Sequence, residues 1–128
     1  MNKPAFNWGD SPQSFIDHIT QDIFVKRCYE EKLPVKEGDI VLDLGASIGP
    51  FSWSVMDKAS KVYAVEPIST RCELIETNTK GYPVEVIKGI LHHSDGEIYF
   101  EDGCLPDGGE QTLSRTCGTT TLLSIITK

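Results

Sequence analysis

The sequence lacks several features by which specialised classes of protein are recognised. Its four cysteines include no C-x-x-C pair, although zinc sites usually draw on closely spaced ligands. Acidic residues outnumber basic ones by 19 to 12, and the net charge of −7 disfavours binding to nucleic acid or to an anionic membrane surface. No apolar run approaches the ~20 residues of a membrane span, and residues 1–10 contain no signal-peptide core. We therefore expect a cytoplasmic protein with no metal site, no membrane contact and no nucleic-acid partner.

What the chain does have is the composition of one globular domain. Of its 128 residues, 39% are hydrophobic and 24% are charged, which provides enough apolar material to bury a core. The first residues are polar and show no periodicity. We expect a loosely held arm over residues 1–14 and a single folded domain over residues 15–128.

Helical and strand patterns alternate along this domain. Helices are predicted over residues 12–31, 50–58 and 69–81, and strands over residues 40–44, 61–65, 84–91 and 98–100. Residues 94–96 are typical of a hairpin turn, residues 102–118 predict an irregular loop, and residues 119–126 predict an extended segment. The alternation predicts an α/β fold with a parallel sheet, in which the strand at 40–44 is buried on both faces.

Acids and glycines mark the ends of the first two predicted strands. Residues 41–49 read VLDLGASIG, with Asp43 two residues before Gly45, and residues 62–67 read VYAVEP. In parallel sheets, a ligand crevice lies at the carboxyl ends of the strands, here suited to a ligand with a ribose and an adenine. Glu66 follows Gly45 by 21 residues, close to the ~20 that separate a glycine-rich turn from a ribose-binding acid in this class of fold.

Asp43 favours one class of cofactor over another. Nicotinamide-binding folds usually run apolar residues up to a G-x-G-x-x-G turn, because that turn receives a pyrophosphate. A carboxylate at this point would repel an anion and attract a cation. S-adenosylmethionine carries an ammonium and a sulfonium group, so it fits the pattern better than NAD does. A nicotinamide-dependent oxidoreductase stays an alternative, since Glu66 indicates a ribose and not a particular cofactor.

In these motifs the chain resembles the FkbM-type family of S-adenosylmethionine-dependent methyltransferases, a branch of the class I Rossmann-like methyltransferases. The family pattern is an apolar strand, then D-x-G-A-N-x-G, then an E-P pair, and this chain has DLGASIG and VEP, with Ser47 in place of the usual asparagine. The resemblance runs from about residue 15 to the C-terminus. It implies an incomplete, three-layer Rossmann-like fold with a parallel core of three strands, helices and an antiparallel C-terminal hairpin.

The predicted cofactor site is built around the glycine-rich turn. Gly45 and Gly49 allow close approach of the backbone to a ligand, and the N–H groups of residues 46–49 would face the methionine carboxylate. Asp43 would receive the ammonium group, and Glu66 would accept both ribose hydroxyls. The adenine end would follow the second and third strands, although a plain core position is an equal alternative for the last two residues. The predicted cofactor-binding residues are Asp43, Gly45, Ala46, Ser47, Gly49, Glu66, Pro67, Ile68, Gly89 and Ile90.

No residue is assigned as a catalytic base. His92 or His93 could deprotonate an acceptor hydroxyl, but neighbours in a strand point to opposite faces, so at most one could serve. A solvated pair beside a hairpin is the alternative that we favour. Tyr29 could line the pocket at its methionine end. The alternative is a core position, which is more common for an aromatic residue on a helix.

The resemblance implies methyl transfer from S-adenosylmethionine to a hydroxyl of a glycan, a sugar or another small molecule. Complete members of the family continue into a D-x-E-G-like segment and further strands that have no counterpart after Thr119, so this chain would supply the cofactor-binding half. The edge of the strand at 40–44 would then be apolar and unpaired, which predicts a homodimer through that edge. A non-catalytic cofactor-binding or assembly module is a further alternative.

Overall fold

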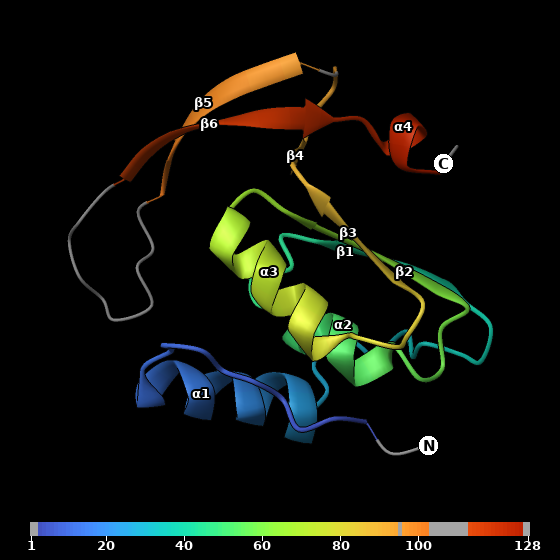
Figure 1. Ribbon diagram of the computed structural model, residues 1–128. Coiled ribbons are helices and arrows are strands. Elements are labelled where there is room, and N and C mark those ends of the chain that lie inside the picture. Colours follow the sequence, from blue (N-terminus) through green and yellow to red (C-terminus); the bar gives the residue numbers. More distant parts are fainter. Residues whose placement is uncertain (1–2, 95, 103–112, 127–128) are drawn as a thin grey trace.

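The computed structural model describes residues 3–94, 96–102 and 113–126 (Figure 1). Its elements are α1 (Gln13–Ile19), the π-helix η1 (Thr20–Val25), β1 (Ile40–Leu44), α2 (Pro50–Val55), β2 (Lys61–Glu66), α3 (Ser69–Asn78), β3 (Val84–Lys88), β4 (Ile90–Leu91), β5 (Gly96–Asp102), β6 (Leu113–Thr120) and α4 (Leu122–Ile126). Among the described residues, no helix combines the length and the apolar character that a membrane crossing demands.

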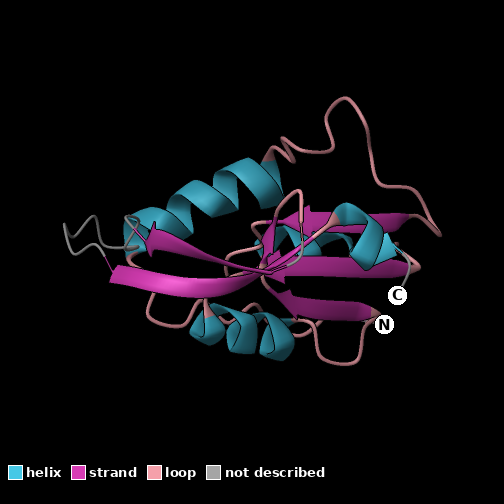
Figure 2. Ribbon diagram, turned by 90° about the horizontal axis from the view of Figure 1, so that it is seen from above, coloured by secondary structure: helices cyan, strands magenta, loops and turns pink. Residues whose placement is uncertain are grey.

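Strands β1, β2 and β3 form a parallel sheet in that order, and Figure 2 shows them side by side. Val41 lies opposite Val62, which in turn lies opposite Val84. The connecting helices α2 and α3 both lie below the sheet in Figure 1, as right-handed crossovers between neighbouring parallel strands require. This β-α-β-α-β order confirms the predicted α/β, Rossmann-like parallel core.

Alternate residues of the strands face α2 and α3 and form the core. Val41 and Val62 pack against Val55 of α2, and Ala64 packs against Ile75 of α3. Val62, Val55, Ala64 and Ile75 are all fully buried. Each such valine or isoleucine contributes about 1.5–3 kcal/mol through burial of its side chain. The core therefore fixes both helices beside the turn that follows β1.

β1 is the outer strand of this sheet. Ile40 and Leu44 are 68% and 47% exposed, whereas Val41 is only 9% exposed. The prediction that this strand is buried on both faces is therefore wrong. Within the described part of the chain, α2 and α3 cover only the face on which Val41 lies.

The C-terminal part forms a second sheet in the order β4-β6-β5, which lies above the parallel sheet in Figure 1. β5 and β6 are antiparallel, so an antiparallel C-terminal pair is present, but its two strands are not the ones that the predicted hairpin joined. The predicted strand 84–91 is split at Gly89, because β4 pairs with Thr119 and Thr120 of β6 instead of continuing the first sheet. β5 also pairs with β6 and not across a turn at residues 94–96.

Two other predictions for this region were wrong. Part of the predicted loop, residues 113–118, belongs to β6, and part of the predicted extended segment, residues 122–126, forms α4. The remainder of the predicted loop, residues 103–112, lies outside the described residues. A strand that depends on a distant partner for its hydrogen bonds carries little local signal, which is why sequence periodicity did not reveal β6.

The helix predicted over residues 12–31 is shorter in the structure, and it consists of an α-helical part followed by a π-helical part. α1 continues as the π-helix η1, and the helix ends at Val25. The chain then turns at Arg27, whose φ is 53°. Burial alone would raise the pKa of Glu30, but hydrogen bonds from Arg27 and the Val35 N–H, with the charges of Arg27 and Lys58, lower it overall. The buried Glu30 carboxylate, paired with the partly exposed Arg27, fixes the segment that leads from η1 to β1.

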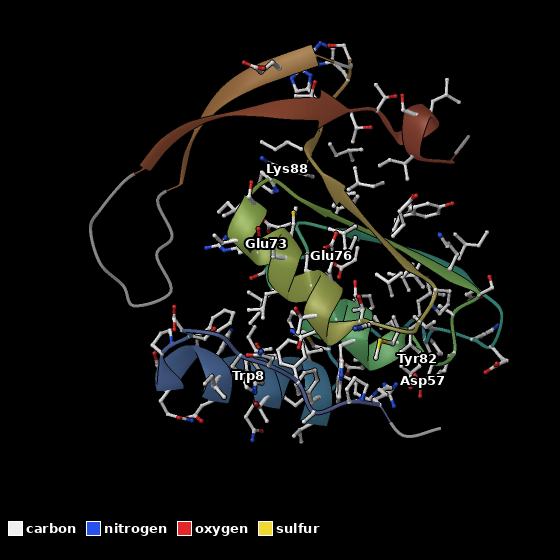
Figure 3. All side chains as sticks on the ribbon, in the orientation of Figure 1. Trp8, Asp57, Glu73, Glu76, Tyr82 and Lys88 are labelled. Atoms are coloured by element: carbon white, nitrogen blue, oxygen red, sulfur yellow. The ribbon has the colours of Figure 1, made fainter. Side chains whose placement is uncertain are left out.

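The N-terminal arm packs along α1, η1 and α2, so the expectation of a loosely held arm is wrong. A cluster of aromatic rings joins it to these helices, with centroid separations of 4.6–6.5 Å among Phe6, Trp8, Phe15, Phe24 and Trp53. Trp8 is labelled in Figure 3, where the arm passes α1. Lys3 forms an ion pair of 3.1 Å with Asp57, and Trp53 Nε1 donates a hydrogen bond to Pro4 O at 3.0 Å.

Candidate functional site

The glycine-rich turn between β1 and α2 contains three left-handed backbone positions. Gly45, Ser47 and Gly49 have φ angles of 75°, 55° and 91°, which glycine adopts freely and serine rarely. The N–H groups of Gly45 and Ala46 both donate to Val65 O, at 2.9 and 3.0 Å. These bonds tie the turn to the end of β2.

Gly49 lies directly against α3. A Cβ atom at this position would stand 3.3 Å from Ile75 Cγ1 and Cγ2 and 3.5 Å from Ile75 Cα. Such contacts are tighter than side chains normally tolerate, and the left-handed φ adds a conformational cost for any residue except glycine. Gly49 therefore lets α2 begin at Pro50 while α3 packs beside it.

Glu66 holds the turn from behind. Its side chain is buried, with the residue only 3% exposed. Oε1 accepts a hydrogen bond from the Ser47 N–H at 2.9 Å, and Oε2 accepts one from the Ile68 N–H at 2.8 Å. Hydrogen bonds to a carboxylate are stronger than neutral ones, so Glu66 fixes both the turn and the start of α3. Its contact with ribose hydroxyls stays a prediction.

Asp43 faces α2, because it lies two residues after the core residue Val41 on the same side of β1. Ser52, which is fully buried, donates from Oγ to Asp43 Oδ2 at 2.6 Å. Burial raises the pKa of Asp43, and the hydrogen bonds from the Ser52 side chain and backbone oppose that rise only in part. No described cationic side chain forms an ion pair with Asp43. A positively charged ligand would stabilise the ionised form of such a carboxyl group.

Asp43 and the turn form one wall of a pocket of about 460 Å³. The opposite wall is apolar and consists of Phe15 and Ile19 of α1 and Ile23 of η1. Tyr29 also lines the pocket, and its ring packs edge-to-face against Phe51 with a centroid separation of 5.3 Å. The remaining lining residues are Leu42, Leu44, Gly45, Ala46, Ser47, Pro50 and Phe51. One carboxylate opposite an apolar wall suits a small ligand that carries a cationic group on an aliphatic chain.

The predicted site residues divide between the pocket and its support. Asp43, Gly45, Ala46 and Ser47 line the pocket, whereas Gly49 and Glu66 lie behind the turn. The N–H groups predicted to face a ligand carboxylate are largely engaged within the protein. Ala46 donates to Val65 O, Ser47 donates to Glu66, and Gly49 donates to Ala46 O. The structure therefore weakens the prediction of a carboxylate held by this turn.

The residues predicted at the adenine end lie away from this pocket. Pro67 and Ile68 follow β2, and Ile68 is 5% exposed. The Gly89 N–H donates to Glu66 O at 3.1 Å, and a Cβ at Gly89 would stand 3.1 Å from Gly118 O. Gly89 thus marks the close crossing of the two sheets, with Ile90 paired to β6. This placement favours the alternative of plain core positions for Gly89 and Ile90.

Sequence reasoning did not recognise the apolar wall. Phe15, Ile19 and Ile23 recur at every fourth position, which predicts a helix and does not show what its apolar face contacts. Only the observed fold shows that this face turns towards Asp43. Tyr29 was predicted as a possible wall of the pocket, and the structure brings it there.

His92 and His93 follow β4 and do not line this pocket. Their rings lie against each other with a centroid separation of 4.1 Å, so the prediction that they point to opposite faces is wrong. The reason is that β4 ends at Leu91, so strand alternation no longer applies to them. Among the described residues, no three His, Cys, Asp or Glu side chains gather closely enough to hold a metal ion.

No protein-family model matches the sequence, and no curated protein matches it either. Parts of solved structures do resemble it. An S-adenosylmethionine-dependent methyltransferase of the DUF858 family from Leishmania major matches 59% of this chain and 32% of its own, at 26% identity and a TM-score of 0.48. Trm5b from Pyrococcus abyssi matches 60% of this chain and 20% of its own, at 24% identity and a TM-score of 0.41.

A third resemblance is to the tRNA m1G37 methyltransferase of M. jannaschii. It covers 48% of this chain and 24% of that protein, at 23% identity and a TM-score of 0.36. The chain therefore spans about a third or less of each of these three proteins. With TM-scores below 0.5, the resemblances do not by themselves assign a function or an acceptor to this chain. The expectation of no nucleic-acid partner, drawn from net charge, stays a prediction.

Proposed function

We propose that this chain binds S-adenosylmethionine and is the cofactor-binding part of a methyltransferase. The observation that carries the proposal is the position of Asp43. Its carboxyl group has a raised pKa, accepts a hydrogen bond from Ser52, and lies at the entry to a glycine-rich turn in a largely apolar pocket. The ammonium group of a methionine moiety would compensate the charge of Asp43.

The other residues of the pocket support the same ligand. The aliphatic part of a methionine moiety would lie along the apolar side chains of Phe15, Ile19 and Ile23. Glu66 would keep the turn in its binding shape through the Ser47 N–H. When bound, S-adenosylmethionine would supply an electrophilic methyl group. A pyrophosphate fits less well, because Asp43 would repel it.

The finer proposal rests on the FkbM-type motifs, DLGASIG and VEP. It is that the methyl group passes to an oxygen, as in a hydroxyl of a sugar, a glycan or another small molecule. Neither the acceptor nor its base is assigned here, since His92 and His93 lie outside the described pocket. A cytoplasmic location stays part of this proposal.

Isothermal titration calorimetry with S-adenosylmethionine and with NAD tests the proposal. We expect S-adenosylmethionine to bind and NAD not to bind. The Asp43→Asn variant should weaken binding about tenfold to a hundredfold, because a charge-assisted hydrogen bond is lost. The control Asp17→Asn removes an exposed acid of α1 and should leave the affinity unchanged. Binding of NAD without S-adenosylmethionine would favour an oxidoreductase instead.

A methyl-transfer assay separates an enzyme from a binding module. The assay would follow formation of S-adenosylhomocysteine with a panel of sugar and small-molecule hydroxyl acceptors. Turnover with any acceptor supports the methyltransferase. Tight binding without turnover across the panel supports the alternative of a non-catalytic cofactor-binding or assembly module.

A further inference from the structure

A buried asparagine joins the N-terminal arm to the glycine-rich turn. Asn78 ends α3 and is 1% exposed. Its Nδ2 donates to Ile48 O at 3.1 Å and to Asn7 O at 3.0 Å. Its Oδ1 accepts a hydrogen bond from the Asn7 N–H at 2.7 Å. One carboxamide therefore connects main-chain atoms of two segments that lie 30 and 71 residues away in the sequence.

The chemistry of this position is specific to asparagine. The contacts require two donors and one acceptor on a single short side chain, which aspartate, leucine and serine do not provide. Because Asn78 is buried, removal of the carboxamide would leave the Ile48 and Asn7 main-chain groups without these partners, and unpaired buried polar groups are costly. Ile48 directly precedes Gly49, so its carbonyl fixes the second half of the turn.

The arm also contacts both helices that begin beside the turn. On α2, Lys3 Nζ donates to Ser54 O at 2.8 Å, and Trp53 donates to Pro4 O. On α3, a Cβ atom at Gly9 would stand 2.8 Å from Leu74 Cδ2, so the arm passes close to this helix. The arm thus bridges α2 and α3, with Asn78 as its buried anchor.

We propose that Asn78 is a positioning residue, which couples docking of the N-terminal arm to the shape of the ligand-binding turn. The arm then belongs to the ligand site although it does not line the pocket. The identity of the ligand rests on the proposed function, whereas the link between arm and turn does not. Because coupling between two sites is reciprocal, a ligand bound at the turn also strengthens docking of the arm.

Hydrogen–deuterium exchange tests the link without any ligand. In Asn78→Ala, we expect amide exchange of residues 46–52 to be about tenfold faster or more, as expected when a hydrogen bond holding the turn is lost. Exchange within β2 and β3 should stay unchanged. The matched control Thr77→Ala alters an exposed neighbour on α3 and should leave the turn as it is. Unchanged exchange at the turn in Asn78→Ala would overturn the proposal.

A second variant covers the case in which Asn78→Ala does not fold. Gly9→Val keeps Asn78 but crowds Leu74, so the arm is displaced while the buried carboxamide is intact. The proposal expects faster exchange at residues 46–52 here as well. Faster exchange confined to the arm would show that arm and turn are independent, against the proposal.

Fluorescence with ligand gives a readout that a purely structural role would not move. The chain has two tryptophans, so Trp8→Phe leaves only Trp53, which donates to Pro4 of the arm. Adding Asn78→Ala to this background should shift Trp53 emission to longer wavelength and raise the Kd for S-adenosylmethionine about tenfold. Saturating S-adenosylmethionine should reverse part of the emission shift.

The two kinds of failure are distinguishable. If S-adenosylmethionine binds the Trp8→Phe variant and the Trp8→Phe/Asn78→Ala double variant with equal affinity, the coupling is refuted although the proposed function stands. If the unaltered chain binds no S-adenosylmethionine, the proposed function is refuted, and the exchange experiment alone decides whether Asn78 links the arm to the turn.

Discussion

The Glu66 carboxylate accepts a hydrogen bond from the Ser47 N–H at 2.9 Å, across 19 residues of sequence. This bond joins the end of β2 to the turn that follows β1. A second bond, from the Ile68 N–H, connects the same carboxylate to the start of α3. The acid that the sequence marks as a ligand group is therefore also a structural support for the backbone around the pocket.

Replacement of Glu66 should destabilise the fold even without ligand. In Glu66→Gln, the amide nitrogen would face one of the two N–H donors, and we expect the free energy of unfolding to fall by about 1.5–3 kcal/mol. Glu76→Gln is the matched control, because Glu76 is exposed on α3 (Figure 3) and should change stability by less than about 0.5 kcal/mol. Urea unfolding measures both. Equal stability of the two variants would contradict the supporting role of Glu66.

Asp43 should make stability depend on pH. Its pKa in the folded chain is raised above the ordinary value of 3.8, so the folded state holds this proton more tightly than the unfolded state. The stabilising contribution is complete below pH 3.8 and is lost as pH rises through the folded-state pKa. We expect Asp43→Asn to abolish this loss and to be at least as stable as the unaltered chain at neutral pH.

Thermal unfolding across pH 4–8 checks the prediction for Asp43. The difference in stability between Asp43→Asn and the unaltered chain should grow in favour of the variant as pH rises. A difference in stability that is constant with pH, or that grows in the opposite direction, would show that folding does not raise the pKa of the Asp43 carboxyl group.

Two glycines separate the cost of backbone conformation from the cost of crowding. Gly49 and Gly81 have similar φ angles, 91° and 87°, but a Cβ at Gly49 meets Ile75 at 3.3 Å, and nothing lies within 4 Å of a Cβ at Gly81. Gly81→Ala should cost about 1 kcal/mol for the left-handed backbone alone. Gly49→Ala should cost about 1–3 kcal/mol more, because α2 and α3 must move apart. Equal losses in chemical unfolding would show that Ile75 adjusts freely.

The exposed edge of β1 should promote self-association. β1 is the outer strand of its sheet, and Ile40 is 68% exposed. An apolar edge with unpaired main-chain groups tends to pair with another chain. We expect a concentration-dependent dimer in analytical ultracentrifugation, weakened by Ile40→Lys and not by Leu33→Lys, since Leu33 is exposed outside the strand. A monomer at all concentrations would refute this prediction.

The parallel core could be predicted because its information is local. Strands at residues 40–44 and 61–65 appear as short apolar runs, and Gly45 and Gly49 mark the turn between strand and helix. The acids Asp43 and Glu66 were recognisable as a pair because the fold class places strand ends together. In the structure Asp43 lines the pocket and accepts a hydrogen bond from Ser52 of α2. Glu66 does not line this pocket and holds the Ser47 and Ile68 N–H groups from behind the turn, so a ligand site shared by the two acids stays a prediction.

The parts that could not be predicted depend on contacts between distant segments. β6 is a strand through pairing with β5 and β4, and its own sequence shows no alternation. Asn78 has no recognisable motif, since its two partners lie in the arm and in the turn. The apolar wall of the pocket has the same periodicity as any amphipathic helix, so sequence alone did not separate it from the core.

Ser47 lies at a φ angle of 55°, where asparagine is common and serine is rare. Serine at this position therefore holds a backbone conformation that it rarely adopts, at a cost of order 1–3 kcal/mol. Two hydrogen bonds hold the turn in this conformation. Glu66 accepts one from the Ser47 N–H, and Asn78 donates the other to the Ile48 carbonyl. Loss of either hydrogen bond would let the strained backbone at Ser47 relax, so the two bonds together keep the wall of the pocket in its observed shape.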